Sequence, residues 1–409
     1  MRNELYAAAL LLGAALAAAT AFAAGPGPGV RMEVRPSDLP APFATGSARN
    51  PPRSVGMPEH AALQVPPGFR VNVFAEGLSD ARWLAVADNG DVFLAEPSAG
   101  RITLLRDTNG DGKADTTSVF ATGFDNPHGL ALRPGYLYVG DSDAVWRLTY
   151  EPGQTKAVGR PEQVTPDGAF GGRGGHWTRD VAFSPDGARF YVAIGSRGNI
   201  DEEKPPRATV QEFAADGTPL GTYASGLRNP VGIAFYPGTS DLYVTVNERD
   251  GLGDELVPDY LTRLTPGGFY GWPYYYIGDH PQPGFADREP DLADDSIVPD
   301  LLFQSHSAPL GLVFYDGKQF PEDYRGDAFV ALHGSWNAAE PRGYMVVRVP
   351  FQEGRPQGYY ESFLTGFWVA GTDHARVDGR PAGLAIAKDG SLLVADDVGQ
   401  KIWRVAYSP

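Results

Sequence analysis

The 409-residue sequence predicts an all-β fold, a six-bladed β-propeller built from four-stranded antiparallel blades. One hairpin-like phrase recurs six times along the chain, which is the pattern expected of a repeat architecture. The 51 glycines and 36 prolines indicate many tight turns and disfavour a mostly helical protein. The hydrophobic content of 42% excludes a disordered chain.

Each copy of the phrase is an apolar-small-apolar triplet, a turn with Gly or Asp, and a β-rich run ending in a polar residue. The copies are 84–86 leading to 92–96, 130–132 to 137–141, 181–183 to 190–196, 233–235 to 242–248, 312–314 to 328–333, and 384–386 to 392–397. Further alternating segments, such as 102–105 and 145–150, raise each unit to about four strands. A closed ring buries each unit against its neighbours, and a double-sheet sandwich is the alternative.

The spacing of the triplets also predicts where extra chain is inserted. The first residues of the triplets lie 46, 51, 52, 79 and 72 residues apart. We therefore expect inserted loops over residues 251–307 and 334–379, on one rim of the scaffold, where functional residues tend to lie.

The N-terminus predicts export. Residues 1–23 read as a secretory signal peptide, with Arg2, an apolar stretch over 5–19 and a small-x-small cleavage pattern at 21–23. A membrane anchor is the alternative. Residues 24–58 are rich in Gly, Pro and Ala and are expected to form a linker or arm, and the propeller takes 59–409. We expect a periplasmic or secreted protein without stable membrane insertion.

The net charge and the lack of cysteine exclude several classes of partner and site. The chain has 34 Lys and Arg against 50 Asp and Glu, a net charge of −16, which argues against nucleic acid as a partner. It has no cysteine, so disulfides, thiolate metal sites and cysteine nucleophiles are excluded.

Basic side chains recur just before the triplets. In a propeller these positions converge on the central channel. They are Arg82, His128, His176, Arg179, Arg228 (followed by Asn229), His306 and Arg380. Such a group of cations in an acidic protein predicts an anionic ligand. The alternative is that the side chains point outward or pair with nearby Asp and Glu.

His176 is the candidate general base. Gly174 and Gly175 precede it and a β-hairpin follows, so it is expected at the mouth of a strand with room for a substrate. An imidazole there suits proton transfer near neutral pH.

Two segments are candidate calcium sites. Oxygen ligands alternate around a glycine turn at Asp107, Asn109, Asp111 and Asp115, although Ser118 stands where a Ca²⁺ loop has its bidentate Glu. A solvated polar turn is the alternative. The second segment follows the fourth copy of the phrase, where glycines were expected to leave backbone carbonyls available as ligands. It contains Glu248, Arg249, Asp250, Gly251 and Asp254.

Five phrases together resemble the soluble, pyrroloquinoline-quinone (PQQ)-dependent sugar dehydrogenases, most closely their sorbosone dehydrogenase-like branch. The resemblance covers residues 71–407. The phrases are 175–187, 226–235, 266–273, 332–337 and 379–385.

The resemblance implies PQQ and Ca²⁺ as cofactors and the oxidation of an aldose or sugar aldehyde by hydride transfer to the quinone. It implies that His176 is the base, that Arg228 and Asn229 bind the cofactor, and that Arg380 contacts a cofactor carboxylate. His333 falls where the family has a cofactor-binding lysine, so it is a candidate for cofactor contact or for sharing the base role. Arg82, His128 and Trp336 complete the expected cofactor-binding set. A membrane quinone or a cytochrome c is the expected electron acceptor.

The sequence departs from the family pattern at several positions. Ser196 replaces an aspartate beside the base, residues 249–252 lack a proline, and Ala338 replaces an arginine of the sorbosone-like branch. Two other functions therefore stay open. One is a Ca²⁺-dependent lactonase using Glu96, Asn126, Asn229 and Asp397, and the other is a non-catalytic propeller that binds a sugar or a protein.

Overall fold

The computed structural model describes residues 24–57 and 62–408, so the predicted signal peptide at 1–23 lies outside the described residues. The fold is all-β, as predicted. The helices of the described residues are single 3₁₀ turns: η1 (Pro36–Asp38), η2 (Pro97–Ala99), η3 (Ala286–Arg288), η4 (Pro290–Leu292) and η5 (Glu322–Tyr324). None of these helices is long and apolar enough to cross a membrane.

Six sheets of four or five strands form the body. The first three are β4 (Trp83–Val86), β5 (Val92–Glu96), β6 (Arg101–Arg106), β7 (Thr116–Thr122); β8 (Leu130–Arg133), β9 (Tyr136–Gly140), β10 (Val145–Thr149), β11 (Glu162–Gln163); and β12 (Val181–Phe183), β13 (Arg189–Ile194), β14 (Thr209–Ala214), β15 (Pro219–Ser225), β19 (Gly268–Phe269). The other three are β16 (Pro230–Phe235), β17 (Leu242–Val246), β18 (Tyr260–Arg263), β22 (Leu301–Leu302); β23 (Pro309–Phe314), β24 (Ala328–Leu332), β25 (Met345–Val349), β28 (Tyr360–Leu364), β1 (Arg31–Met32); and β31 (Pro381–Ile386), β32 (Leu392–Asp396), β33 (Lys401–Tyr407), β3 (Phe69–Glu76).

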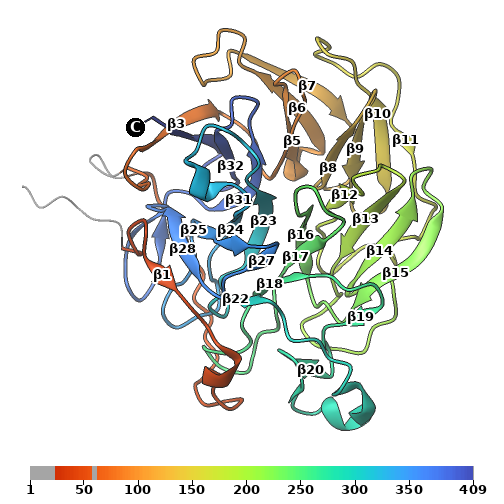
Figure 1. The fold of residues 1–409 in the computed structure, drawn as a ribbon, viewed down its shortest axis with the longest axis vertical. Helices are drawn as coiled ribbons and strands as arrows, with labels where there is room; N and C mark the ends of the chain where they lie inside the picture. The colour runs from red at the N-terminus through yellow and green to blue at the C-terminus, as the bar shows by residue number, and fades with distance from the viewer. Residues whose placement is uncertain (1–23, 58–61, 409) are drawn as a thin grey trace, which may run out of the picture.

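The sheets lie around a common centre with their first strands innermost (Figure 1). Each first strand contacts the first strand of the next sheet, in the order β4, β8, β12, β16, β23, β31 and back to β4. The six triplets predicted from the sequence all fall in these first strands, and the runs that follow them match the second strands, although most extend one or two residues past the strand end.

The sixth sheet joins the two ends of the chain. Its outer strand, β3, comes from the N-terminal part and pairs antiparallel with β33 at the C-terminus, from Phe69 opposite Tyr407 to Glu76 opposite Lys401. The sequence analysis did not predict this strand.

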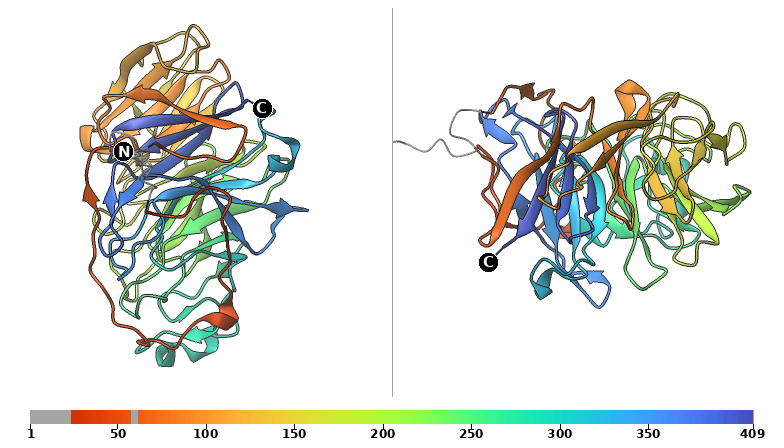
Figure 2. Two further views of the ribbon diagram at one scale, coloured as in Figure 1. Left: turned by 90° about the vertical axis from the view of Figure 1, so that its left-hand side faces the viewer. Right: turned by 90° about the horizontal axis from the view of Figure 1, so that it is seen from above.

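The N-terminal arm also contributes strands. β1 pairs antiparallel with β28, and β2 (Arg53–Ser54) pairs parallel with β30 (Arg376–Val377), which in turn pairs with β29 (Trp368–Ala370). Between these pairings the red segment runs along the outside of the molecule (Figure 2).

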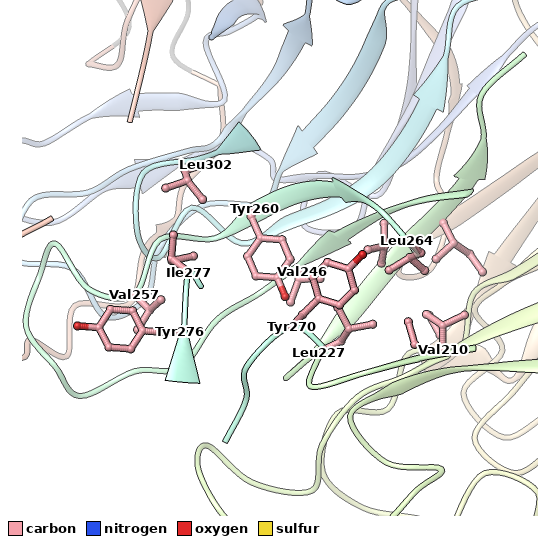
Figure 3. Packing of buried hydrophobic residues seen from close by; sticks show 14 of the residues in the cluster. Val210, Leu227, Val246, Val257, Tyr260, Leu264, Tyr270, Tyr276, Ile277 and Leu302 are labelled. Carbon is pink, nitrogen blue, oxygen red and sulfur yellow. The ribbon is translucent and has the colours of Figure 1, made fainter. Parts of the chain in front are cut away.

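The core lies between neighbouring sheets, because the strands bury side chains on both faces. One cluster between the third and fourth sheets contains Val210, Val246, Tyr260 and Tyr270, all buried (Figure 3). Glycine allows the inner strands to approach closely, since a Cβ on Gly232 would lie 2.3 Å from the carbonyl oxygen of Leu310 in the next sheet.

The two ranges predicted as inserted loops contain more than loops. Residues 251–307 include β18 and β22, and 334–379 include β25 and β28, which are regular third and fourth strands. The true additions are two small hairpins, β20 (Tyr275–Tyr276) with β21 (His280–Pro281) and β26 (Phe351–Gln352) with β27 (Arg355–Pro356), together with the β29–β30 pair. The triplet spacing correctly marked the long units but did not separate strands from connections.

Candidate functional site

The antiparallel pairing of the strands places the candidate functional residues on one rim of the fold. Because first and second strands are antiparallel, the starts of the first strands and the ends of the second strands lie on the same side, for example Val181 opposite Val192 and Pro230 opposite Val246. A cavity of about 200 Å³ opens there between the third, fourth and fifth sheets. Its lining is His176, Arg228, Asn229, Asn247, Glu248, Asp250, Asp259, His306, Ala308, Trp336 and Asn337.

His176 is held in a defined orientation at this cavity. Its Nδ1 lies 2.9 Å from the carbonyl oxygen of Ser196 and 3.1 Å from the Ser196 hydroxyl. A carbonyl only accepts hydrogen bonds, so Nδ1 carries the proton and Nε2 carries the lone pair. Nε2 has no hydrogen-bond partner among the described residues. Burial, with a further contribution from the charge of Arg228, lowers the pKa of His176 to about 4, so the imidazole is neutral at neutral pH.

The contact with Ser196 shows which group orients the imidazole of His176. The aspartate of the resembled family is absent, and the Ser196 backbone carbonyl orients the imidazole in its place. The serine hydroxyl in turn donates to the carbonyl of Gly198 at 2.7 Å.

Arg228 is buried and fixed by backbone oxygens. It donates to the carbonyls of Asn199 (3.0 Å) and Glu248 (2.8 Å), and its Nη2 lies 3.6 Å from Asp250. The neighbouring Asn229 has a buried Oδ1 without a hydrogen-bond partner among the described residues. An unpartnered buried oxygen beside a fixed guanidinium is a ready polar contact for a ligand.

Asn199 connects these groups and was missed by the sequence analysis. Its side-chain amide pairs with the Asp250 peptide as a second peptide would, with Nδ2 donating to the carbonyl (2.9 Å) and Oδ1 accepting from the N–H (2.8 Å). The same Oδ1 also accepts from Arg228 Nη2 at 3.0 Å. Asn199 lies in a loop without periodicity, so no sequence pattern marked it.

His306, also singled out in the sequence, has both ring nitrogens occupied. Nε2 donates to the carbonyl of Gly253 at 3.1 Å, and Nδ1 lies 3.0 Å from Asn337 Nδ2. Burial lowers its pKa, but the nearby Asp250 outweighs this effect and the pKa is raised. His306 therefore supports the wall and does not compete with His176 as a base.

Two buried carboxyl groups belong to the cavity lining. Burial raises the pKa of Glu248 to about 7 and that of Asp259 to about 6. Asp259 accepts hydrogen bonds from the backbone N–H groups of Glu248 and Ala308, both at 2.8 Å, so it ties the fourth sheet to the start of the fifth.

A second cluster centres on Asp397, on the same rim. Asp397 pairs with Arg82 and accepts from His333 Nε2 at 2.9 Å, while Arg380 donates to the carbonyls of His333 (2.9 Å) and Gly334 (2.6 Å). Burial, followed by the charge of Arg380, lowers the pKa of His333 to about 4. Burial alone would raise the pKa of Asp397, but His333 and Arg82 hold it well below its usual range.

The candidate cations are therefore partly compensated by the protein itself. Arg82 pairs with Asp397, and Arg228 lies near Asp250. The structure brings His176, Arg228, Asn229 and Trp336 to one cavity, whereas Arg82, His333 and Arg380 form the adjacent Asp397 cluster and do not line it.

His128 lies apart from the cavity. Its side chain is fully buried (0% exposed), and its ring packs on Trp83 with centroids 4.1 Å apart. Neither ring nitrogen has a partner among the described residues. Burial lowers its pKa well below the usual value. These contacts are those of a core residue.

The first candidate calcium loop lies on the opposite face, at the turn between β6 and β7. Its carboxylates already accept hydrogen bonds from the turn itself, with Asp107 bound to the N–H of Gly110 (2.7 Å) and of Gly112 (2.8 Å). Asp111 accepts from Lys113 N and Asp115 from Thr108 N, both at 2.9 Å.

The second candidate loop has few oxygens to spare. The carbonyls of Glu248, Asp250 and Gly253 accept from Arg228, Asn199 and His306. Arg249 extends to Gln282 Oε1 at 3.1 Å. Within residues 24–57 and 62–408, no three His, Cys, Asp or Glu side chains are grouped as metal ligands. Calcium in either loop stays a prediction.

Comparison with known proteins places the chain in a family. The family model described as TrAA12-like matches residues 63–258 and 284–408. The chain belongs to the TrAA12-like family. The resemblance to PQQ-dependent sugar dehydrogenases found in the sequence is confirmed at this level.

Individual relatives of this TrAA12-like chain are distant. It is 26% identical over 358 residues to an uncharacterized protein of Borreliella burgdorferi, covering 85% of this chain and 91% of that one. It is 28% identical over 338 residues to the pyrroloquinoline quinone-dependent pyranose dehydrogenase of Coprinopsis cinerea, covering 71% of this chain and 45% of the relative. The TrAA12-like chain thus spans less than half of that enzyme.

Solved structures share its fold. The holo PQQ domain of the Coprinopsis cinerea pyranose dehydrogenase has a TM-score of 0.71 at 22% identity, covering 87% of this chain and 99% of that one. The PQQ-bound aldose sugar dehydrogenase of Streptomyces coelicolor has a TM-score of 0.58 at 18% identity, covering 84% and 99%.

Proposed function

We propose that the protein is a periplasmic or secreted quinoprotein dehydrogenase that uses PQQ to oxidise an aldose or a sugar aldehyde. The observation that carries the proposal is the neutral His176, oriented by the Ser196 carbonyl and with Nε2 unpartnered, on a cavity beside Arg228 and Asn229. The PQQ-dependent relatives agree with it. The sorbosone-like substrate is the finer form of this proposal.

We further propose that the six sheets are the blades of a closed six-bladed propeller. The unbroken circuit of contacts among the six first strands supports closure. The pairing of β3 with β33 supports it as well, because it completes the sixth sheet with a strand from the other end of the chain.

The residues of the cavity fit a flat polyanionic quinone. Arg228 offers a fixed positive charge, and the Asn229 side-chain amide lines the same cavity. Trp336 is 47% exposed at the cavity, which leaves an aromatic face free to pack against a planar ring. When bound, PQQ supplies an acceptor of two electrons in the form of hydride. Arg228, Asn229 and Trp336 would hold it.

His176 performs the proton transfer in this mechanism. Its Nε2 takes the proton of the anomeric hydroxyl while the C1–H bond breaks with loss of hydride, so an aldose leaves as the lactone and a hydrated aldehyde leaves as the acid. The Ser196 carbonyl stabilises the imidazolium that forms, because it accepts from Nδ1–H throughout. The charge of Arg228 opposes this protonation, which keeps the base neutral before each turnover.

His333 does not share this role in the proposal, because its Nε2 donates to Asp397. Together with Arg82 and Arg380 it forms a charged flank beside the cavity. No step is assigned to Ca²⁺, since the loop carbonyls at 248, 250 and 253 are already hydrogen-bonded to protein donors.

The lactonase alternative is not favoured. Glu96 is bound by Arg101 and Thr103, and Asp397 by Arg82 and His333, so neither acid is available to a metal.

The reduced cofactor of a dehydrogenase must be reoxidised, and we propose a membrane quinone or a cytochrome c as acceptor.

The test is titration of the purified protein with PQQ, followed by dye-linked oxidation of a panel of aldoses and sugar aldehydes. We expect PQQ to bind with a change in its absorbance and to support turnover. His176→Ala should bind PQQ comparably but lose turnover by about 10³-fold. Absence of PQQ binding, or full activity in His176→Ala, would overturn the proposal.

A further inference from the structure

The N-terminal arm touches the cavity wall at residues 43–50, which we call the rim segment. The rim segment lies outside the ranges matched by the family model, which begin at residue 63. It nevertheless contacts both loops that carry cavity residues, namely 248–255 and 335–342. We propose that the rim segment is part of the functional site and that Asn50 is a positioning residue for Trp336.

Asn50 binds the loop that carries Trp336. Its backbone N–H donates to the Trp336 carbonyl at 2.7 Å. The two N–H groups of its side-chain Nδ2 are shared among three carbonyls, those of Ala338 (3.0 Å), Ala339 (3.1 Å) and Asp373. Asn50 is itself buried, so these bonds are shielded from water. The loop after β24 is thereby fixed at Trp336 and directly after Asn337.

The other end of the rim segment binds the 248–255 loop. Phe43 N–H donates to the Leu252 carbonyl, and the Thr45 hydroxyl accepts from the Asp254 N–H, both at 2.8 Å. Gly253 has φ +115, and a Cβ there would lie 2.8 Å from the Thr45 hydroxyl. The glycine is therefore required for the arm to approach this closely.

The two loops are also bound to each other and to the cavity. Asp254 accepts from the Ala339 N–H at 2.9 Å, and Asn337 Nδ2 donates to Asp250 Oδ1 at 2.5 Å. The rim segment thus packs outside two loops whose hydrogen bonds to each other include the cavity residues Asn337 and Asp250.

Trp336 needs such support because its own side chain offers little. It is 47% exposed, so packing holds the indole only in part, and the contacts of the surrounding backbone contribute to its position. The backbone contact nearest to it is the bond from Asn50 N–H to its carbonyl. Loss of the Asn50 side chain leaves that backbone bond in place but removes the bonds to the carbonyls of Ala338 and Ala339, so the position of Trp336 should become more variable.

The test compares Asn50→Ala with Ser47→Ala, a control in the same segment whose side chain is exposed and outside these contacts. Acrylamide quenching of Trp336 is obtained as the difference between each protein and its Trp336→Phe counterpart. Hydrogen exchange of residues 250–255 and 335–340 is followed by mass spectrometry. Neither measurement requires PQQ or substrate, so they stand even if the proposed function fails.

We expect Asn50→Ala to increase quenching of Trp336 and to speed exchange in both loops by about tenfold, the factor that corresponds to loss of a buried hydrogen bond. If the proposed function holds, PQQ or sugar affinity should fall by about the same factor, with a smaller change in kcat. Asn50→Asp loses the same side-chain donor and sets a buried carboxylate against the three carbonyl oxygens, so its effect should be at least as large as that of Asn50→Ala. Unchanged quenching and exchange in a folded Asn50→Ala protein would overturn the inference, as would equal effects in Ser47→Ala.

Discussion

The two ring nitrogens of His176 have different surroundings. Nδ1 is committed to a backbone carbonyl, which no change of pH can remove, and Nε2 is left for chemistry. A backbone partner fixes the tautomer without adding the negative charge that an aspartate would bring. Burial, followed by the charge of Arg228, lowers the pKa of His176 to about 4, and no aspartate beside Nδ1 counters this shift.

This low pKa gives a pH dependence with a definite sign. Protonated His176 cannot accept a proton, so kcat/KM should fall as the pH drops, with its midpoint near pH 4 instead of the usual 6.5. The same shift means that the unfolded chain takes up the proton first. His176 therefore lowers the free energy of unfolding as the pH falls from about 6.5 to about 4. A pH–rate profile with its acid midpoint near 6.5 would contradict the assignment.

Residues at strand ends could be predicted from the sequence, and residues in loops could not. Arg228 and Asn229 directly precede β16, and His176 lies shortly before β12, so the strand pattern predicted the rim on which they lie. Asn199 and Asn50 act through contacts 51 and 288 residues away in sequence, to Asp250 and Ala338. Hydrophobic periodicity carries no information on such contacts. For the same reason, the sequence does not predict the ion pair between Arg82 and Asp397.

At the level of elements, Asp180 joins three of the six innermost strands. It precedes β12 and accepts from the Trp83 indole N–H in β4, from Val181 N–H, and from Ile233 N–H in β16, each at 2.9 Å. The register shift in β16 between Pro230 and Ile233 frees the last of these donors. Burial raises the pKa of Asp180 to about 7.

We expect Asp180→Asn to destabilise the protein by about 1–3 kcal/mol. An amide cannot accept from all three donors, so its NH₂ must face another N–H. Urea unfolding measures the change. Asp186→Asn, at an exposed turn of the same sheet, is the matched control and should change stability by about 0.5 kcal/mol or less. Equal stability of the two variants would show that the Asp180 contacts are not structural.

The element pattern itself was largely predictable, because each triplet and the run after it form a local antiparallel pair. β3 escaped prediction for the opposite reason. It has no neighbouring hairpin partner, since the strand beside it, β33, is at the other end of the chain. The repeat pattern predicts sheets whose strands follow one another in sequence. The sixth sheet instead combines three C-terminal strands with β3 from the N-terminal part.

For the whole molecule, Phe69 anchors that distant pairing. Its ring lies 4.8 Å from Phe320, 5.0 Å from Phe363 and 5.0 Å from Tyr407, so it joins the fifth and sixth sheets as well as the two ends of the chain.

Phe69→Ala should therefore reduce the free energy of unfolding by about 3 kcal/mol, and Phe69→Leu by about 1 kcal/mol. Chemical denaturation monitored by tryptophan fluorescence gives both values. A loss in Phe69→Ala no greater than that in Phe69→Leu would mean that this aromatic cluster does not stabilise the packing of the fifth and sixth sheets.

The pairing of the first long strand with the last one sets a condition on synthesis. Residues 69–76 leave the ribosome early, but the strand that covers their edge is made only with residues 401–407. Until then the growing chain carries an open edge at its start, which invites pairing with other chains. The sixth sheet is thus completed only after residues 401–407 have been made, and a chain that stops before residue 401 leaves the edge of β3 unpaired.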